Sequence, residues 1–201
     1  MVTAIARTYL GSTAEERRLL RRETLLKAGC DVYAQRGYRN ATVKAICERA
    51  GLTERYFYES FPNNEALFLA LFKDVSARML DEVRAAGEAV RGDPAGKARA
   101  ILEAYYRGLQ AEPAPARVFV IEAADISPAA HEIARLTFER FTDLLTQAWT
   151  DAPVQRDPAL RVGVSGAVVQ IARDWICNGF SQPLTSVVDA ALRISAVLAE
   201  Q

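Results

Sequence analysis

Hydrophobic residues recur along most of this chain at every third or fourth position, the spacing that places side chains on one face of an α-helix. The strict alternation of apolar and polar residues that marks a half-buried strand is absent, and prolines fall between the periodic segments. The pattern predicts an all-α fold of nine helices, at residues 14–35, 43–50, 54–61, 64–87, 94–111, 117–126, 128–150, 158–178 and 184–199.

Short polar side chains stand where these helices should begin. Thr13 and Glu16 have the spacing of a capping box, in which each side chain accepts a hydrogen bond from the backbone of the other. Gly37 follows the first helix, where a left-handed residue is common, and residues 112–116 are expected to form a loop. Further N-caps are expected from Thr42, Thr53, Asn63 and, each before a proline, Asp93, Ser127 and Asp157.

Two short helices separated only by residues 50–52 have the layout of a helix-turn-helix, whose second helix enters the major groove of DNA. If Phe57 points inward, the turn of about 100° per residue leaves Arg55, Tyr56, Tyr58 and Glu59 on the outer faces. Arginine can bind guanine with two hydrogen bonds, and a tyrosine hydroxyl can reach a phosphate. The sequence therefore favours a DNA-binding helix over a connecting helix that exposes aromatic residues by chance.

Residues 25–68 resemble the DNA-binding region of the TetR-type (TetR/AcrR) transcriptional regulators. The shared features are residues 28–33, Arg36-Gly37-Tyr38, Thr42, Ile46, Ala50-Gly51, Phe57-Tyr58, Phe61 and Glu65-Ala66-Leu67. The resemblance implies a three-helix DNA-binding domain at residues 13–62 and a ligand-binding and dimerisation domain at residues 63–201, preceded by a flexible arm at residues 1–12.

The resemblance also implies individual DNA contacts: phosphate contacts from Thr42, Tyr58 and Ser60, and base contacts from Glu54, Arg55 and Tyr56. We add Lys44, on the outer face of its helix, as a phosphate contact. Three departures weaken the expected affinity. Asn64 stands where the family usually has a lysine, Ser60 is shorter than the frequent His or Tyr, and Glu54 and Glu59 bring negative charge near DNA, although Glu54 can accept from a cytosine amine.

In the second domain, aromatic side chains suggest a pocket for a small lipophilic effector between the helices. The same residues can instead be ordinary core. The candidates are Tyr105, Tyr106, Phe119, Glu122, Phe138, Phe141 and Trp175. The resemblance further implies a homodimer joined through the last two long helices, by Val162, Gly166, Val169, Val187, Ala191, Ile194 and Leu198. The competing interpretation is that these residues pack within one subunit.

The zero net charge of the whole chain hides a difference between its N-terminal and C-terminal parts. The chain has 201 residues, with 25 basic and 25 acidic side chains, and zero net charge by itself argues against nucleic acid. Residues 1–60, however, hold 11 Lys and Arg against 7 Asp and Glu, and residues 61–201 hold 14 against 18. This modest basic excess predicts DNA binding of moderate affinity with strong salt dependence.

Other chemistries find little support. Cys30, Cys47 and Cys177 are odd in number and lack CxxC spacing, which suits free thiols in a reducing compartment and predicts no metal site. The GxGxxG and GxxxxGK(S/T) motifs are absent, so we expect no cofactor. Long apolar runs and a secretory signal are absent, so we expect a cytoplasmic protein without a membrane partner. A catalytic triad would depend on the single histidine, His131, with Ser165 or a cysteine.

The sequence thus predicts a sequence-specific transcriptional regulator and not an enzyme: a dimeric repressor that a small lipophilic effector releases from a double-stranded, palindromic operator. A DNA-binding dimer without an effector is the alternative, and a helical hydrolase that uses His131 is the remote one.

Overall fold

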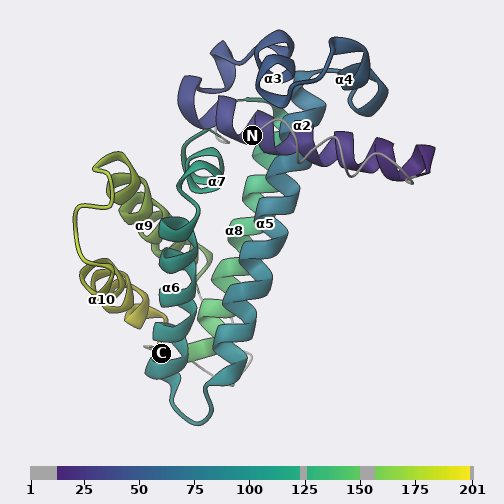
Figure 1. Ribbon diagram of the computed structural model, residues 1–201. Helices are drawn as coiled ribbons and strands as arrows, with labels where there is room; N and C mark the ends of the chain where they lie inside the picture. Colours follow the sequence, from purple (N-terminus) through teal and green to yellow (C-terminus); the bar gives the residue numbers. More distant parts are fainter. Residues whose placement is uncertain (1–12, 123–125, 150–156, 200–201) are drawn as a thin grey trace. The chain divides into compact units, whose positions relative to one another are not determined.

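The computed structural model describes residues 13–122, 126–149 and 157–199, and within these ranges all regular elements are helical, with no strand (Figure 1). The predicted all-α fold is confirmed. The described α-helices number nine: α2 (Ala14–Arg36), α3 (Val43–Ala50), α4 (Glu54–Ser60), α5 (Asn64–Ala89), α6 (Pro94–Ala111), α7 (Pro113–Arg117), α8 (Pro128–Trp149), α9 (Pro158–Cys177) and α10 (Leu184–Ser195). The arm expected at residues 1–12 lies outside the described residues.

The chain forms two compact units, residues 1–71 (unit 1) and 72–201 (unit 2). In unit 1, α3 and α4 pack against α2, and the first residues of α5 complete the core. Leu25, Tyr33, Ile46, Phe57 and Phe68 are fully buried there. Burial of these side chains helps to hold the short helices α3 and α4 in place, since isolated helices of 8 and 7 residues are marginal in water.

Helical periodicity predicts a buried stripe of Leu19, Leu26, Cys30 and Tyr33 on α2, and the structure buries a different set. Leu25 is fully buried instead of Leu26, which is half-buried, and Leu19 is 48% exposed. Figure 1 shows the start of α2 extending past α4 within unit 1, so the core of this unit receives only the later turns of the helix. Buried residues accordingly begin at Leu25 and continue through Cys30 to Tyr33.

Helix ends follow the predicted caps with three exceptions. Thr13 and Glu16 form the capping box, and Thr42, Asn63, Ser127 and Asp157 accept from backbone N–H groups as expected. The side chains of Thr53 and Asp93 make no such bond. Gly37 has a positive φ of 74° but an extended ψ of 157°, so it is not the left-handed residue that we expected.

In unit 2, α6 packs against α8 and α10, and α9 packs against α10. Polar tips of buried aromatic residues find backbone partners: the Tyr106 hydroxyl donates to the Val168 carbonyl at 3.0 Å, and the Trp175 indole donates to the Gln182 carbonyl at 2.9 Å. These bonds satisfy groups that would be costly to bury alone.

The segment expected as a loop at residues 112–116 is helical instead. Helix α7 begins at Pro113 and passes into a turn of π-helix, η2 (Val118–Glu122). Pro113 and Pro115 lie in the first turn, where backbone N–H groups have no partner within the helix and proline therefore loses nothing. The helix expected at residues 117–126 thus starts earlier, and residues 123–125 lie outside the described residues.

No described helix is both long and apolar enough to cross a membrane.

Candidate nucleic-acid interface

The turn between α3 and α4 is built from backbone contacts around a glycine. Gly51 adopts the left-handed conformation, with φ 66° and ψ 30°, and closes α3. The next backbone N–H, of Leu52, donates to the Cys47 carbonyl at 3.0 Å. Glycine reaches this conformation without the steric cost that a side chain imposes. The chain therefore reverses direction within three residues and presents α4 immediately after α3.

The orientation of α4 is set by its apolar residues. Phe57 is fully buried and Phe61 is 3% exposed, and their rings contact each other with centroids 5.9 Å apart. On the outer faces, 85% of the Arg55 side chain is exposed, and Tyr58, whose ring edge contacts Phe57, is 56% exposed. The inward and outward faces predicted from the helical period are confirmed for these four residues.

The remaining candidate contact residues are distributed around this helix. Glu54 is exposed and Tyr56 is half-buried on α4, where Ser60 is half-buried at the last turn. Thr42 and Lys44 are exposed at the start of α3, although the Thr42 hydroxyl also accepts from the Ala45 N–H at 3.1 Å. An accepted hydrogen bond leaves the hydroxyl proton able to donate to a phosphate oxygen.

Asn64 has a role that sequence reasoning missed. Its Oδ1 accepts from the Tyr33 hydroxyl at 2.7 Å, and its Nδ2 donates to the Ala41 carbonyl at 2.9 Å. Lysine carries only donors, so it cannot accept from the tyrosine. The departure at this position is therefore tied to the packing of α2, α5 and the segment before α3.

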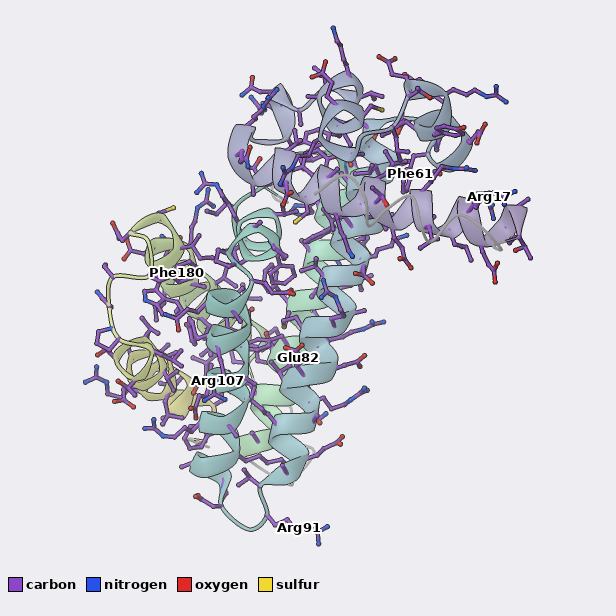
Figure 2. The ribbon with its side chains drawn as sticks, in the orientation of Figure 1. Arg17, Phe61, Glu82, Arg91, Arg107 and Phe180 are labelled. Carbon is purple, nitrogen blue, oxygen red and sulfur yellow. The ribbon has the colours of Figure 1, made fainter. Side chains whose placement is uncertain are left out.

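Two arginines of α2 also lie against α4, and no role was expected for either. The Arg21 guanidinium carbon is 4.4 Å from the centroid of the Tyr56 ring, and that of Arg22 is 4.4 Å from the Phe61 ring. In Figure 2, Phe61 lies between α4 and α2. The sequence signals these contacts only by the pair of arginines itself, because helical periodicity places Leu19 and Leu26, not Arg21 and Arg22, on the packed face of α2.

The effector-pocket candidates occupy the interior of unit 2. Tyr105, Tyr106, Phe119, Phe141 and Trp175 are buried, and several of their rings contact each other, as do those of Tyr105 and Phe141 at 5.0 Å. Burial raises the pKa of Tyr105, and its hydroxyl forms no hydrogen bond within the described part of the chain. Phe138 and Glu122 are half-buried.

Two hollows bear on these candidates. A pocket of about 50 Å³ between residues of α5, α6 and α7 is lined by Phe119, and an open groove of about 640 Å³ along α8 and α9 is lined by Phe138. The other five candidates line neither hollow. A ligand site for a molecule of drug size has a volume of about 300–1,000 Å³. Of these two hollows the groove alone reaches this size, and it lies outside the aromatic core.

The residues expected at a dimer interface divide into two groups. Val162 is 72% exposed, Gly166 and Ile194 are exposed, and Val169 is half-buried. Val162, Gly166 and Val169 line the groove along α9. The structure buries the other three inside unit 2, where their side chains cannot contact a second subunit directly: Val187, Ala191 and Leu198.

His131 lies exposed in the first turn of α8, and within the described residues it has no hydrogen bond to Ser165 or to a cysteine. His, Cys, Asp and Glu side chains do not gather in threes as a metal site would require anywhere in those same ranges.

Comparison with known proteins agrees with the geometry of unit 1. Residues 25–71 match the family model described as "Bacterial regulatory proteins, tetR family". The chain is 38% identical over 58 residues to an uncharacterized HTH-type transcriptional regulator, YdgC, of Bacillus subtilis (strain 168), a match that spans 29% of this chain and only 30% of YdgC. It is 24% identical over 178 residues to the HTH-type transcriptional activator FasR of Mycolicibacterium smegmatis, across 87% of this chain and 81% of FasR.

The fold has a counterpart among solved structures. The transcriptional regulator FadR from Bacillus subtilis, solved in complex with stearoyl-CoA, superimposes with a TM-score of 0.73 over 86% of this chain and 96% of that chain, at 16% sequence identity. At this identity the likeness concerns the fold.

Proposed function

Because the chain belongs to the TetR family of bacterial regulatory proteins, a family of transcriptional regulators, we propose that it is a cytoplasmic homodimer that binds a palindromic DNA operator and represses transcription until a small lipophilic effector releases it. One observation carries the DNA-binding part of this proposal. Helix α4 buries Phe57 completely while it exposes 85% of the Arg55 side chain and 56% of Tyr58. An exposed arginine and tyrosine on a short helix after a tight turn match the chemistry of base and phosphate contacts.

The test begins with selection of preferred sequences from a random duplex library, because the operator is not specified by the chain. Fluorescence anisotropy then measures the affinity of the selected duplex at several salt concentrations. We expect affinity to fall steeply with salt, and Arg55→Ala to lower it roughly 5- to 150-fold, the value of a paired arginine–guanine contact. Arg91→Ala removes the same charge from unit 2 and serves as the matched control (Figure 2). Binding without salt dependence, or equal binding by Arg55→Ala, would contradict the proposal.

The dimer is supported by symmetry and by the surface of unit 2. A palindromic site requires two recognition helices about 34 Å apart, or a multiple of that distance, which a two-fold dimer supplies. The exposed Val162 and the small Gly166 on α9 give that helix an apolar surface suited to close approach. Val187, Ala191 and Leu198 would then stabilise the unit behind this surface.

The effector part draws on the aromatic core of unit 2 and on the stearoyl-CoA complex of the related fold. An effector that binds the released conformer about 100-fold better than the DNA-bound one shifts the balance by about 2.7 kcal/mol. Stearoyl-CoA should therefore release the selected duplex in the anisotropy assay, and free coenzyme A, which lacks the acyl chain, should not. Equal effects of both compounds would contradict a lipophilic effector.

A second candidate function, a DNA-binding dimer without an effector, has its own support. Five of the seven pocket candidates are packed in the core, and the hollow beside Phe119 holds only about 50 Å³. An acyl chain would have to open this core before it could bind. Calorimetric titration with stearoyl-CoA distinguishes the two functions, since the effector-free dimer gives no binding heat at any concentration below the micelle range.

A further inference from the structure

The carboxylate of Glu59 lies between arginines from two helices. Its Oε1 is 3.2 Å from Nε of Arg55, one turn earlier on α4, and accepts a hydrogen bond from it. Its Oε2 is 3.7 Å from Nη2 of Arg21, which comes from α2. The negative charge that the sequence seemed to place against DNA is thus engaged by two cations of its own unit.

Arg21 of α2 contacts both Glu59 and Tyr56 of α4. Only 17% of its side chain is exposed, and its guanidinium carbon lies 4.4 Å from the centroid of the Tyr56 ring. Tyr56 and Glu59 are three residues apart on α4, so they are neighbours on its surface. One guanidinium of α2 therefore contacts an aromatic face and a carboxylate of α4 and fixes both relative to α2.

The ion pair with Glu59 leaves the terminal amino groups of Arg55 available to bind a base. Glu59 engages Nε, on the side of the guanidinium, and the two terminal amino groups lie outside this ion pair. A pair of guanidinium N–H groups binds O6 and N7 of guanine with two hydrogen bonds. Without the carboxylate, a long and exposed arginine is equally able to turn toward a phosphate, which carries no sequence information.

We propose that Glu59 is a specificity-determining positioning residue, held by Arg21, that directs Arg55 toward a base edge and away from the DNA backbone. This inference rests on the proposed DNA-binding function. Such positioning has opposite effects on affinity and on sequence discrimination. The negative charge lowers the affinity for every DNA sequence, while the restrained arginine increases the difference between the preferred sequence and others.

The test compares Glu59→Ala with the unmodified full-length chain. Selection from a random duplex library gives the preferred sequence, and anisotropy measures affinity for it, for each single-base variant and for random duplex at fixed salt. We expect Glu59→Ala to bind random duplex more tightly and to lower the discrimination at the base read by Arg55 about five- to tenfold. Arg21→Met should lower the same discrimination, because it frees both Glu59 and Tyr56.

Two controls separate this effect from charge and from folding. Glu48→Ala removes one negative charge from an exposed position of α3, so it should strengthen binding to random duplex without changing the discrimination at any base. In an Arg55→Ala background, Glu59→Ala should no longer alter base preference, since the residue that it positions is missing. Glu59 is exposed at the surface, and circular dichroism tests whether each variant is folded.

The outcomes distinguish this inference from the function on which it rests. An unmodified chain that selects no sequence overturns the DNA-binding function and this inference with it. A chain that selects a sequence, with base preferences that Glu59→Ala leaves unchanged at all positions, overturns the positioning role alone. A loss of discrimination of the same size in Glu48→Ala also overturns it, because the effect would then be one of net charge.

Discussion

At the scale of single residues, Asn64 joins three segments of unit 1. Its amide accepts from the Tyr33 hydroxyl of α2 and donates to the Ala41 carbonyl that precedes α3, while its own backbone begins α5. Burial raises the pKa of Tyr33, which keeps the phenol protonated and able to donate. Asn64 therefore links the start of α5 to α2 and to the segment before α3.

We expect Asn64→Ala to lower the free energy of unfolding by about 1–3 kcal/mol, because it removes the donor to the Ala41 carbonyl and leaves the Tyr33 hydroxyl only the longer bond to the backbone carbonyl of residue 64, at 3.2 Å. Urea denaturation followed by circular dichroism measures the change. Asn178→Ala is the matched control, since this asparagine is exposed at the end of α9. Equal stability of the two variants would show that the hydrogen bonds of the Asn64 side-chain amide do not stabilise the protein.

The three cysteines should differ in reactivity. Cys177 is exposed, whereas Cys30 and Cys47 are buried. Burial, together with the nearby charge of Glu54, raises the pKa of the Cys47 thiol, so less thiolate is present at a given pH and reaction requires more alkaline solution. Titration of the native protein with a disulfide reagent at pH 8 should show one fast thiol, which Cys177→Ser abolishes. Two or more fast thiols would contradict the buried placement.

At the scale of elements, α3 and α4 begin at threonines that behave differently. Thr42 accepts from the Ala45 N–H at 3.1 Å, whereas the Thr53 side chain caps nothing. An N-cap hydrogen bond is worth about 0.5–2 kcal/mol. Both residues occupy the same position in the helix and have the same extended backbone, so they form a natural pair for comparison.

Thr42→Ala should lower the free energy of unfolding by about 1 kcal/mol, and Thr53→Ala should change it by much less, because only the first removes a cap. Thermal unfolding of the two variants measures the difference. Thr42→Ser keeps the hydroxyl and should restore most of the stability. A larger loss in Thr53→Ala would contradict the capping assigned here.

Local sequence patterns predicted most of the helices, but not all of their bounds and buried faces. Caps and periodicity placed most helices within one or two residues, because both depend on neighbours a single turn away. The same logic failed at residues 113–117, where two prolines suggested a loop but occupy the first turn of α7. It failed again for α2, because exposure of Leu19 depends on which other segments reach that part of the helix.

At the scale of the whole molecule, the surface along α8 and α9 is the main candidate for contact with a second subunit. The groove there holds about 640 Å³ and combines Phe138, Val162 and Val169 with arginines such as Arg161. Val162 is the most exposed of the large apolar residues in the described chain, at 72%. Apolar surface of this kind is typical of protein–protein contacts.

If the proposed dimer forms through this groove, Val162→Arg should convert it to monomers, because two-fold symmetry brings the introduced charge of each subunit against the same surface of the other. Sedimentation velocity at micromolar concentration measures the mass. Leu20→Arg changes an exposed leucine of α2 in unit 1 and should leave the dimer intact. A dimer that survives Val162→Arg would move the interface away from this groove.

The amino-acid sequence by itself determined the helical class, the turn at Gly51 and the outward placement of Arg55 and Tyr58 on α4, but not that of Tyr56, which is half-buried against Arg21. These features depend on helical periodicity and on the conformational freedom of one glycine, both of which act between near neighbours. It also determined that basic charge is concentrated in residues 1–60.

Only the tertiary structure decided which side chains meet across helices. It tied Asn64 to Tyr33, placed Arg21 against Tyr56 and Glu59, packed most of the aromatic pocket candidates into the core, and buried Val187, Ala191 and Leu198. The contacts of Asn64 with Tyr33, and of Arg21 with Tyr56 and Glu59, join residues that are 31 or more positions apart, and periodicity does not encode which faces of distant helices come together. The candidate DNA-binding helix α4 was therefore visible in the sequence, whereas the residues from other helices that pack against it were not.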